Sequence, residues 1–257
     1  MDTFVVAACC AVLGLAVGSF LNVVIWRVPR KEPVAVGRSR CPRCDEHIRA
    51  RDLVPLVSWF ALDGRCRRCD ARIPARYPLV ELGCAVLFGL VAVRFDVTWE
   101  LPAFLLLAAT LLAVSVIDLE HYIVPNRIVF PVSALSVPLL ALGVLGDGGV
   151  ADLQRAVLAG LAGFAVLFAL HMISPRGLGM GDVRLAFVLG LYLGWLGWGW
   201  LALGLFLGFL LGAVIGLLLV VARLRARTEH IPFAPFLAAG AMVAVLWGQP
   251  LLDWYTG

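Results

Sequence analysis

The sequence predicts an all-α polytopic membrane protein with about eight transmembrane helices and a small cytoplasmic zinc-ribbon-like subdomain between the first and second. Three observations predict this fold. Of the 257 residues, 62% are hydrophobic and only 15% are charged, whereas a soluble domain of this length needs far more charge on its surface. The apolar residues gather in long runs, and one polar segment with two pairs of cysteines interrupts them. Backbone groups in lipid need hydrogen-bond partners within their own segment, so the spans must be helical.

The apolar runs define where the chain crosses the membrane. Eight of them approach the length of about 18 to 25 residues that a membrane helix needs. The first follows Asp2, which stands where a cleaved signal peptide would carry basic residues, so we interpret this run as a retained first helix. The second and sixth runs are the shortest. The eight runs cover residues 4–26, 78–93, 101–117, 123–145, 153–173, 183–198, 200–222 and 233–251.

The basic residues predict the orientation, because lysine and arginine gather on the cytoplasmic side of membrane helices. With the N-terminus outside, 19 of the 21 basic residues are cytoplasmic, and only Arg94 and Arg155 are outside. Thirteen of the 19 lie between Arg27 and Arg76, and the other six are Arg127, Arg176, Arg184, Arg223, Arg225 and Arg227. The outer loops instead carry acidic residues, namely Asp96, Glu100, Asp147 and Asp152. A net charge of +4 is also found in proteins that bind nucleic acid. Because the basic residues lie beside the apolar runs, we instead expect a lipid bilayer as partner and no nucleic acid.

The segment 28–77 is the only polar region long enough to form a subdomain. We therefore divide the chain into a first transmembrane helix, 1–27, a cytoplasmic cysteine-rich zinc-binding subdomain, 28–77, and a transmembrane core, 78–257. A segment of about 50 residues rarely buries enough apolar surface to be stable alone, and a bound metal would supply the missing stability.

Four cysteines form two C-x-x-C pairs in this segment, Cys41 with Cys44 and Cys66 with Cys69. Such pairs are typical of a tetrahedral structural zinc site, because each tight turn presents two sulfurs to one metal. The pairs are separated by 21 residues, slightly more than the usual spacing of about 15 to 20. Two disulfides are one alternative, which a reducing cytoplasm disfavours, and free thiols are the other. Four cysteine ligands leave no position for water, so the predicted metal is structural.

Two aspartates are the candidate catalytic residues, because ionisable groups at the edge of a membrane span are costly to place there. Asp118 follows the third run and Asp182 precedes the sixth, so both fall at the cytoplasmic face in the predicted orientation. Peptide hydrolysis by two carboxyl groups needs one ionised, to take a proton from water, and one protonated, to polarise the scissile carbonyl. The alternative is that both are interfacial charges facing lipid headgroups. Glu81, at the start of the second run, is either a cavity residue or an interfacial anchor.

Four motifs, in order along nearly the whole chain, resemble those of the bacterial type IV prepilin leader peptidase family. The segment Gly179-Met180-Gly181-Asp182 is similar to the GxGD signature of these aspartyl proteases. The other three motifs are residues 18–29, the paired cysteines followed by residues 76–82, and residues 231–240. The chain departs from the family pattern at Ala234, where glycine is frequent, at Arg184, where lysine is frequent, and in the segment 52–55, where Asn-Ile-Pro is commoner.

The resemblance implies a membrane-embedded aspartic endopeptidase of the bacterial inner membrane. Such enzymes remove the basic leader from type IV prepilins and from the pseudopilins of type II secretion, at the cytoplasmic face. Asp118 and Asp182 match the two catalytic positions of the family. Many members also N-methylate the new N-terminal residue with S-adenosylmethionine, although the residues that bind this methyl donor are not identified by the sequence. The alternatives are a peptidase without methyl transfer, and a membrane transporter whose aspartates bind cations.

Overall fold

The computed structural model describes residues 2–35, 37, 39–146, 148–175, 177–222 and 231–256. Its described part is helical apart from turns, loops and two isolated β-bridges, as predicted. The chain divides into two compact units, Met1–Val97 and Thr98–Gly257. Several residues used to predict the orientation lie outside the described ranges, namely Arg38, Asp147, Arg176, Arg223, Arg225 and Arg227.

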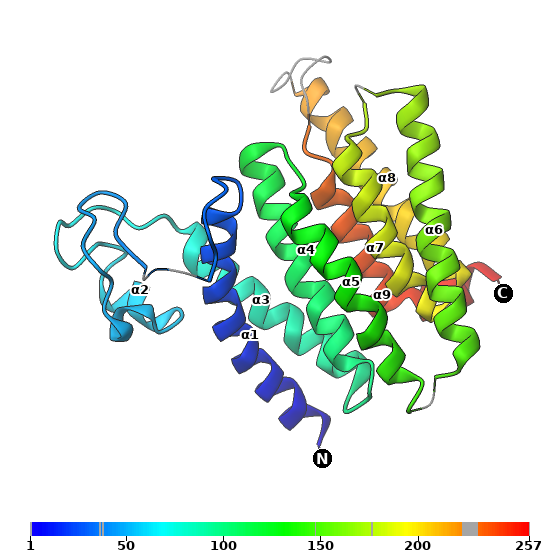
Figure 1. Ribbon diagram of the computed structural model, residues 1–257, viewed down its shortest axis with the longest axis horizontal. Helices are drawn as coiled ribbons and strands as arrows, with labels where there is room; N and C mark the ends of the chain where they lie inside the picture. The colour runs from blue at the N-terminus through cyan, green and yellow to red at the C-terminus, as the bar shows by residue number, and fades with distance from the viewer. Residues whose placement is uncertain are drawn as a thin grey trace. The chain divides into compact units, whose positions relative to one another are not determined.

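The first unit is built on two long helices, α1 (Thr3–Arg27) and α3 (Arg76–Phe95), which pack along each other. Glycines of α1 make this packing close: a Cβ atom added at Gly14 would lie 2.7 Å from the Cα of Ala85 in α3. Small residues at the contact let two helix backbones approach in this way. Between the helices, the chain forms the cysteine-bearing loop and two short helices, η1 (Ala50–Leu53) and α2 (Val57–Ala61) (Figure 1).

The second unit is a bundle of six helices arranged around α7. The helices are α4 (Leu101–His121), α5 (Asn126–Gly143), α6 (Val150–Ile173), α7 (Met180–Leu196), α8 (Trp198–Val221) and α9 (Ala234–Thr256). Helix α7 packs against α5, α6, α8 and α9, and 12 of its 17 residues are buried. By contrast, only three of the 24 residues of α8 are buried. An apolar helix with so little buried surface is suited to face lipid.

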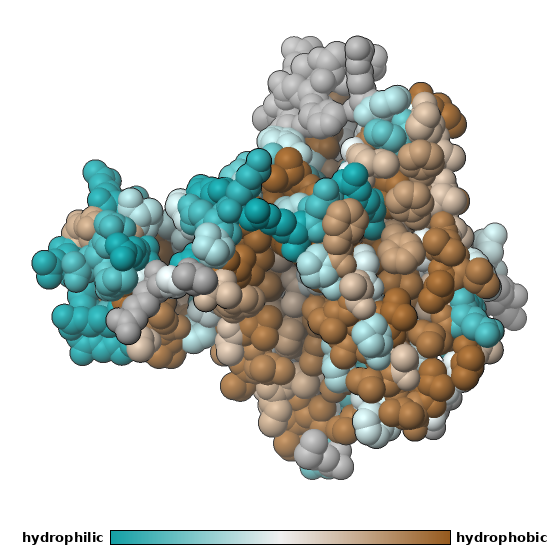
Figure 2. Space-filling view, in the orientation of Figure 1, coloured by the Kyte–Doolittle hydropathy of each residue, from teal (hydrophilic) through white to brown (hydrophobic). Residues whose placement is uncertain are grey.

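The eight predicted spans correspond to the eight long helices. Seven of these helices, all except α7, are long and apolar enough to cross a membrane. Helix α7 has 17 residues, or about 26 Å at 1.5 Å per residue, which is slightly less than the hydrocarbon thickness of about 30 Å. Figure 2 shows hydrophobic residues over the exposed side of the second unit's helices and hydrophilic residues over the cysteine-bearing loop.

Two helix ends differ from the predicted boundaries at the aspartates. The third predicted span ends at residue 117, but α4 continues to His121, so that Asp118 lies in its last turn. The sixth predicted span begins at residue 183, but α7 begins at Met180, so that Asp182 lies in its first turn. Apolar runs define the lipid-facing part of a helix, whereas these turns are polar and are held by hydrogen bonds.

Candidate active site

Asp118 is positioned by the end of α4. The helix stops because Tyr122 adopts the left-handed conformation, with φ of 56°, while its N–H donates to the carbonyl oxygen of Asp118. Such a left-handed residue is a common way to end a helix. The chain then runs through residues 123–125 and enters α5 at Asn126. The loop that follows Asp118 is therefore short and closely tied to it.

Asp182 is positioned by the start of α7. Its Oδ2 accepts a hydrogen bond of 3.2 Å from the N–H of Gly179, which precedes the helix. Between the two, Gly181 allows the loop after α4 to come close, because a Cβ atom there would lie 2.7 Å from the Cβ of Val124. The second glycine of the motif is thus needed for contact between the two segments that carry the aspartates.

The two aspartates line one cavity of about 330 Å³ in the second unit. Both side chains are buried, Asp118 at 5% and Asp182 at 7% exposure. Residues from the start of α5, from the turn before α7 and from the segment 231–233 line the same cavity. Two buried carboxyl groups that face one space favour a state in which they share a single proton, because two negative charges would repel each other.

One oxygen of each aspartate accepts a hydrogen bond from a backbone N–H. Asp118 Oδ2 accepts a hydrogen bond of 3.1 Å from the backbone N–H of Ala234, the first residue of α9. This N–H has no partner within its own helix, because the first turn of a helix leaves its N–H groups free. Asp182 Oδ1, in contrast, is buried and has no hydrogen-bond partner among the described residues.

Two polar side chains hold the segments around the cavity in place. Arg184 lines it and donates from Nη1 to the side-chain oxygen of Asn126 over 2.7 Å. His171, near the end of α6, forms a hydrogen bond of 2.7 Å from Nδ1 to the carbonyl of Leu178. A carbonyl only accepts, so Nδ1 carries the proton. This contact fixes the turn that leads into α7.

The four cysteines of the C-x-x-C pairs come together in the first unit. Their sulfur atoms lie within 4.8 Å of one another, and the distance between Cys41 and Cys69 is 3.8 Å. Four sulfurs at about 2.3 Å from a zinc ion in a tetrahedron are about 3.8 Å apart, so this arrangement fits the metal. Hydrogen bonds from the backbone N–H groups of Cys69 and Arg68 lower the pKa of the Cys66 thiol to about 7. All seven cysteines are free.

The two cysteine pairs share one local structure. In each, the N–H of an aspartate donates to the carbonyl of the first cysteine, as Asp45 does to Cys41 and Asp70 to Cys66. Both aspartates have positive φ, 54° and 57°, and each pairs with the arginine that precedes the first cysteine. Two equal knuckles that face each other form the usual frame of a four-cysteine zinc site.

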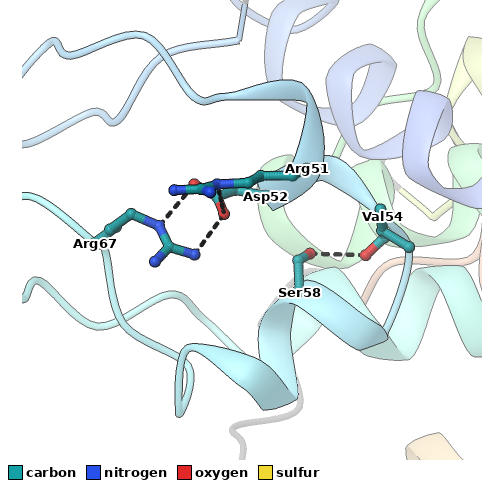
Figure 3. A network of polar contacts seen from close by, with 5 residues as sticks. All are labelled: Arg51, Asp52, Val54, Ser58 and Arg67. Atoms are coloured by element: carbon teal, nitrogen blue, oxygen red, sulfur yellow. Dashed lines mark hydrogen bonds and ion pairs between the residues drawn. The ribbon is translucent and has the colours of Figure 1, made fainter.

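An ion pair ties one knuckle to the rest of the loop. Arg67, between Cys66 and Cys69, donates from Nε and Nη2 to the two carboxylate oxygens of Asp52 over 3.0 and 2.8 Å (Figure 3). These bonds hold the pKa of the Asp52 carboxyl below its usual range. Asp52 begins the segment 52–55, in which the sequence departs from the family pattern, and here it has a structural partner.

A larger cavity of about 1640 Å³ lies in the first unit, between the end of α1, the start of α3 and the cysteine-bearing loop. Asn22 and Glu81 line it, and both are buried. The sequence offered cavity lining as one of two readings of Glu81, and the structure supports that reading. The sequence did not indicate a role for Asn22, which it places only within the motif at residues 18–29.

Comparison with known proteins finds a matching family model for each half of the chain. A family model described as the bacterial peptidase A24 N-terminal domain matches residues 12–95, and one described as the type IV leader peptidase family matches residues 105–217. A prepilin leader peptidase/N-methyltransferase of Stutzerimonas stutzeri is 37% identical, over 96% of this chain and 92% of the relative. Proteins of the same name are 38% identical in Aeromonas salmonicida, covering 94% and 90%, and 37% identical in Pseudomonas aeruginosa, covering 96% and 92%. No solved structure matches the chain.

Proposed function

We infer the activity of this chain from one premise: it belongs to the type IV leader peptidase family. We propose that it is a membrane-embedded aspartic endopeptidase that cleaves the leader from prepilins or pseudopilins and N-methylates the new N-terminal residue. The relatives that cover nearly its whole length are named for both activities. The observation that supports the peptidase activity most directly is the pair of buried aspartates that line one cavity.

Asp118 and Asp182 divide the acid and base work of hydrolysis. The ionised carboxyl of the pair takes a proton from a water molecule, which then attacks the scissile carbonyl. The other carboxyl keeps its proton and polarises that carbonyl. The Oδ1 atom of Asp182, buried without a partner among the described residues, supports this role because it is free for water or substrate.

The substrate is a prepilin or pseudopilin, whose leader ends just before a hydrophobic helix. An apolar helix of this kind partitions into the lipid bilayer, beside the exposed apolar surface of the second unit. The enzyme lies in the bacterial inner membrane with its N-terminus outside and its aspartates at the cytoplasmic face, as the distribution of arginines favours. Family membership gives no support to the alternative of cation transport.

Two further groups belong to this proposal. Zinc has a structural role at Cys41, Cys44, Cys66 and Cys69, in a cysteine-rich subdomain at 28–77 between the first helix, 1–27, and the peptidase core, 78–257. S-adenosylmethionine supplies the methyl group for N-methylation when it is bound. A peptidase without methyl transfer is the remaining alternative, and the mass of the product separates the two.

The test is cleavage of a purified prepilin by the full chain in detergent, with S-adenosylmethionine present. Asp118→Asn and Asp182→Asn should each lower the rate by about 10²- to 10⁴-fold, because each removes a general acid or base. Glu120→Gln changes an exposed carboxyl two residues from Asp118 and serves as the matched control, with near-normal cleavage. The wild-type product should be one methylene heavier than the cut chain. Full cleavage by either aspartate variant would refute the dyad.

A further inference from the structure

Asn22 is a buried side chain whose hydrogen-bonding capacity is only half used. It is 4% exposed, and its Nδ2 donates to the carbonyl of Tyr77, 3.1 Å away in the first turn of α3. Its Oδ1 is buried with no hydrogen-bond partner in the described part of the chain. Leaving such an acceptor unpaired costs stability. Asn22 also lines the large cavity of the first unit, so a ligand in that cavity is the candidate partner for this oxygen.

Glu81 adds a carboxylate to the same cavity. It is 8% exposed, and its Oε2 accepts a hydrogen bond of 2.8 Å from the N–H of Leu56. Within the described ranges no basic side chain forms an ion pair with it. A buried carboxylate without a cationic partner is costly. Glu81 therefore adds a carboxylate that forms no ion pair with a described side chain to a cavity whose lining also includes arginines.

The backbone that holds Glu81 is strained. Leu56 has φ of 59° and ψ of −53°, and the N–H of Val57 bonds to the carbonyl of Pro55 over 2.6 Å. These are the features of the γ-turn with positive φ, which is rare and unfavourable. Such backbone strain is concentrated at functional sites, where the surrounding structure enforces it. Here it directs the Leu56 N–H at the Glu81 carboxylate.

The wall of the cavity is braced by the cysteine cluster. Asp52 and Pro55 line the cavity together with Trp59, and the ion pair from Asp52 to Arg67 ties this wall to the second knuckle (Figure 3). The Trp59 ring is itself fixed, because its Nε1 donates to the carbonyl of Ile73. Trp59 thus adds an aromatic side chain to the lining, and aromatic faces attract cations.

We propose that this cavity binds a primary ammonium group, with Asn22 Oδ1 and the Glu81 carboxylate as its acceptors. An ammonium group brings three N–H donors and one positive charge, which satisfies both acceptors at once. The inference rests on the proposed function for the source of the ligand. Two molecules in that reaction carry such a group: S-adenosylmethionine, through its α-amino group, and the newly cut chain, through its terminal amine.

Equilibrium binding to the full chain in detergent tests this site and separates the two sources. The probes are S-adenosylhomocysteine and a peptide with the sequence of the cut N-terminus, each compared with its N-acetylated form. Acetylation of the true ligand should weaken wild-type binding by about tenfold to hundredfold, the effect of losing hydrogen bonds to a charged group. The probe that shows this difference identifies the source.

The variants show whether the two named residues cause the difference. Asn22→Leu and Glu81→Gln should each bind the free and acetylated probes almost equally, whereas Asn22→Asp keeps an acceptor and should still discriminate. Thr3→Val removes a different hydrogen bond between the same two helical regions, from Thr3 to Asp96, and should behave like the wild type. It controls for loosened packing.

Two results would overturn the proposal: no effect of acetylation on either probe in the wild type, or full discrimination by Asn22→Leu and Glu81→Gln. Cleavage of prepilin is measured on the same wild-type preparation. If cleavage is absent there, the proposed function is wrong, whereas the comparison of free and acetylated probes still decides the ammonium site.

Discussion

Replacement of Gly181 by alanine tests whether the two aspartate-bearing segments must touch. The added Cβ would lie 2.7 Å from the Cβ of Val124, whereas carbon atoms in contact prefer about 3.5 to 4.0 Å. The loop after Asp118 must therefore retreat by about 1 Å. A displacement of this size at an active site costs about 10²-fold in rate, or about 2.7 kcal/mol of transition-state stabilisation.

The assay is single-turnover cleavage of a purified prepilin, with thermal unfolding measured in parallel. Because the clash is with the Cβ of Val124, the double variant Gly181→Ala with Val124→Gly should recover much of the lost rate. Gly177→Ala is the matched control, since its Cβ would meet only the hydroxyl of Ser174, which can rotate away. Cleavage by Gly181→Ala within about threefold of the wild type would refute the reasoning, given the 10²-fold loss expected.

Three further predictions concern other contacts. Ala234→Pro removes the N–H that donates to Asp118 at a helix position where proline is tolerated; cleavage should fall about tenfold, whereas Ala234→Gly should cleave normally. Arg67 lowers the pKa of the Asp52 carboxyl, so their ion pair stabilises the loop at pH values above the pKa that Asp52 has in the unfolded chain. This stabilisation is lost as the pH falls through the pKa of Asp52 in the folded chain. The unfolding temperature of Asp52→Asn should therefore fall less in acid than that of the wild type, and an equal fall in both would contradict the prediction. The cysteine cluster should hold one zinc ion per chain by elemental analysis, and its removal by a chelator should lower the unfolding temperature. Replacement of His47, which lies three residues after Cys44, by alanine should leave the metal bound, because four cysteines complete the site.

Features set by lipid could be predicted from the sequence. The eight spans follow from apolar runs, because a bilayer imposes both a minimum length and a helical backbone. The four cysteines also follow from local spacing, and their clustering is confirmed. The equal knuckles were visible as well, since Arg-Cys-x-Arg-Cys-Asp occurs at 40–45 and again at 65–70.

Contacts between distant segments could not be predicted in this way. The N–H of Ala234 reaches Asp118 across 116 positions of sequence, and a backbone donor leaves no mark in side-chain patterns. Gly179 and Gly181 stand before Asp182 in the sequence, but nothing in the sequence names Val124 as their neighbour. Asn22 lies within an apolar run, where its unpaired oxygen becomes visible only once its surroundings are known. The catalytic roles of the two aspartates stay a prediction.

The short length of α7 bears on how deep Asp182 lies in the bilayer. Helix α8 follows α7 after Gly197 alone and has 24 residues against 17, so it exceeds α7 by seven residues, or about 10 Å. Helix α6, also of 24 residues, exceeds it equally. Because α8 turns back at Gly197, its additional residues lie toward the end of α7 that carries Asp182. With the same starting depth at Gly197, a helix of 17 residues holds Asp182 deeper in the bilayer than one of 24 residues would, nearer to a hydrophobic substrate in the lipid.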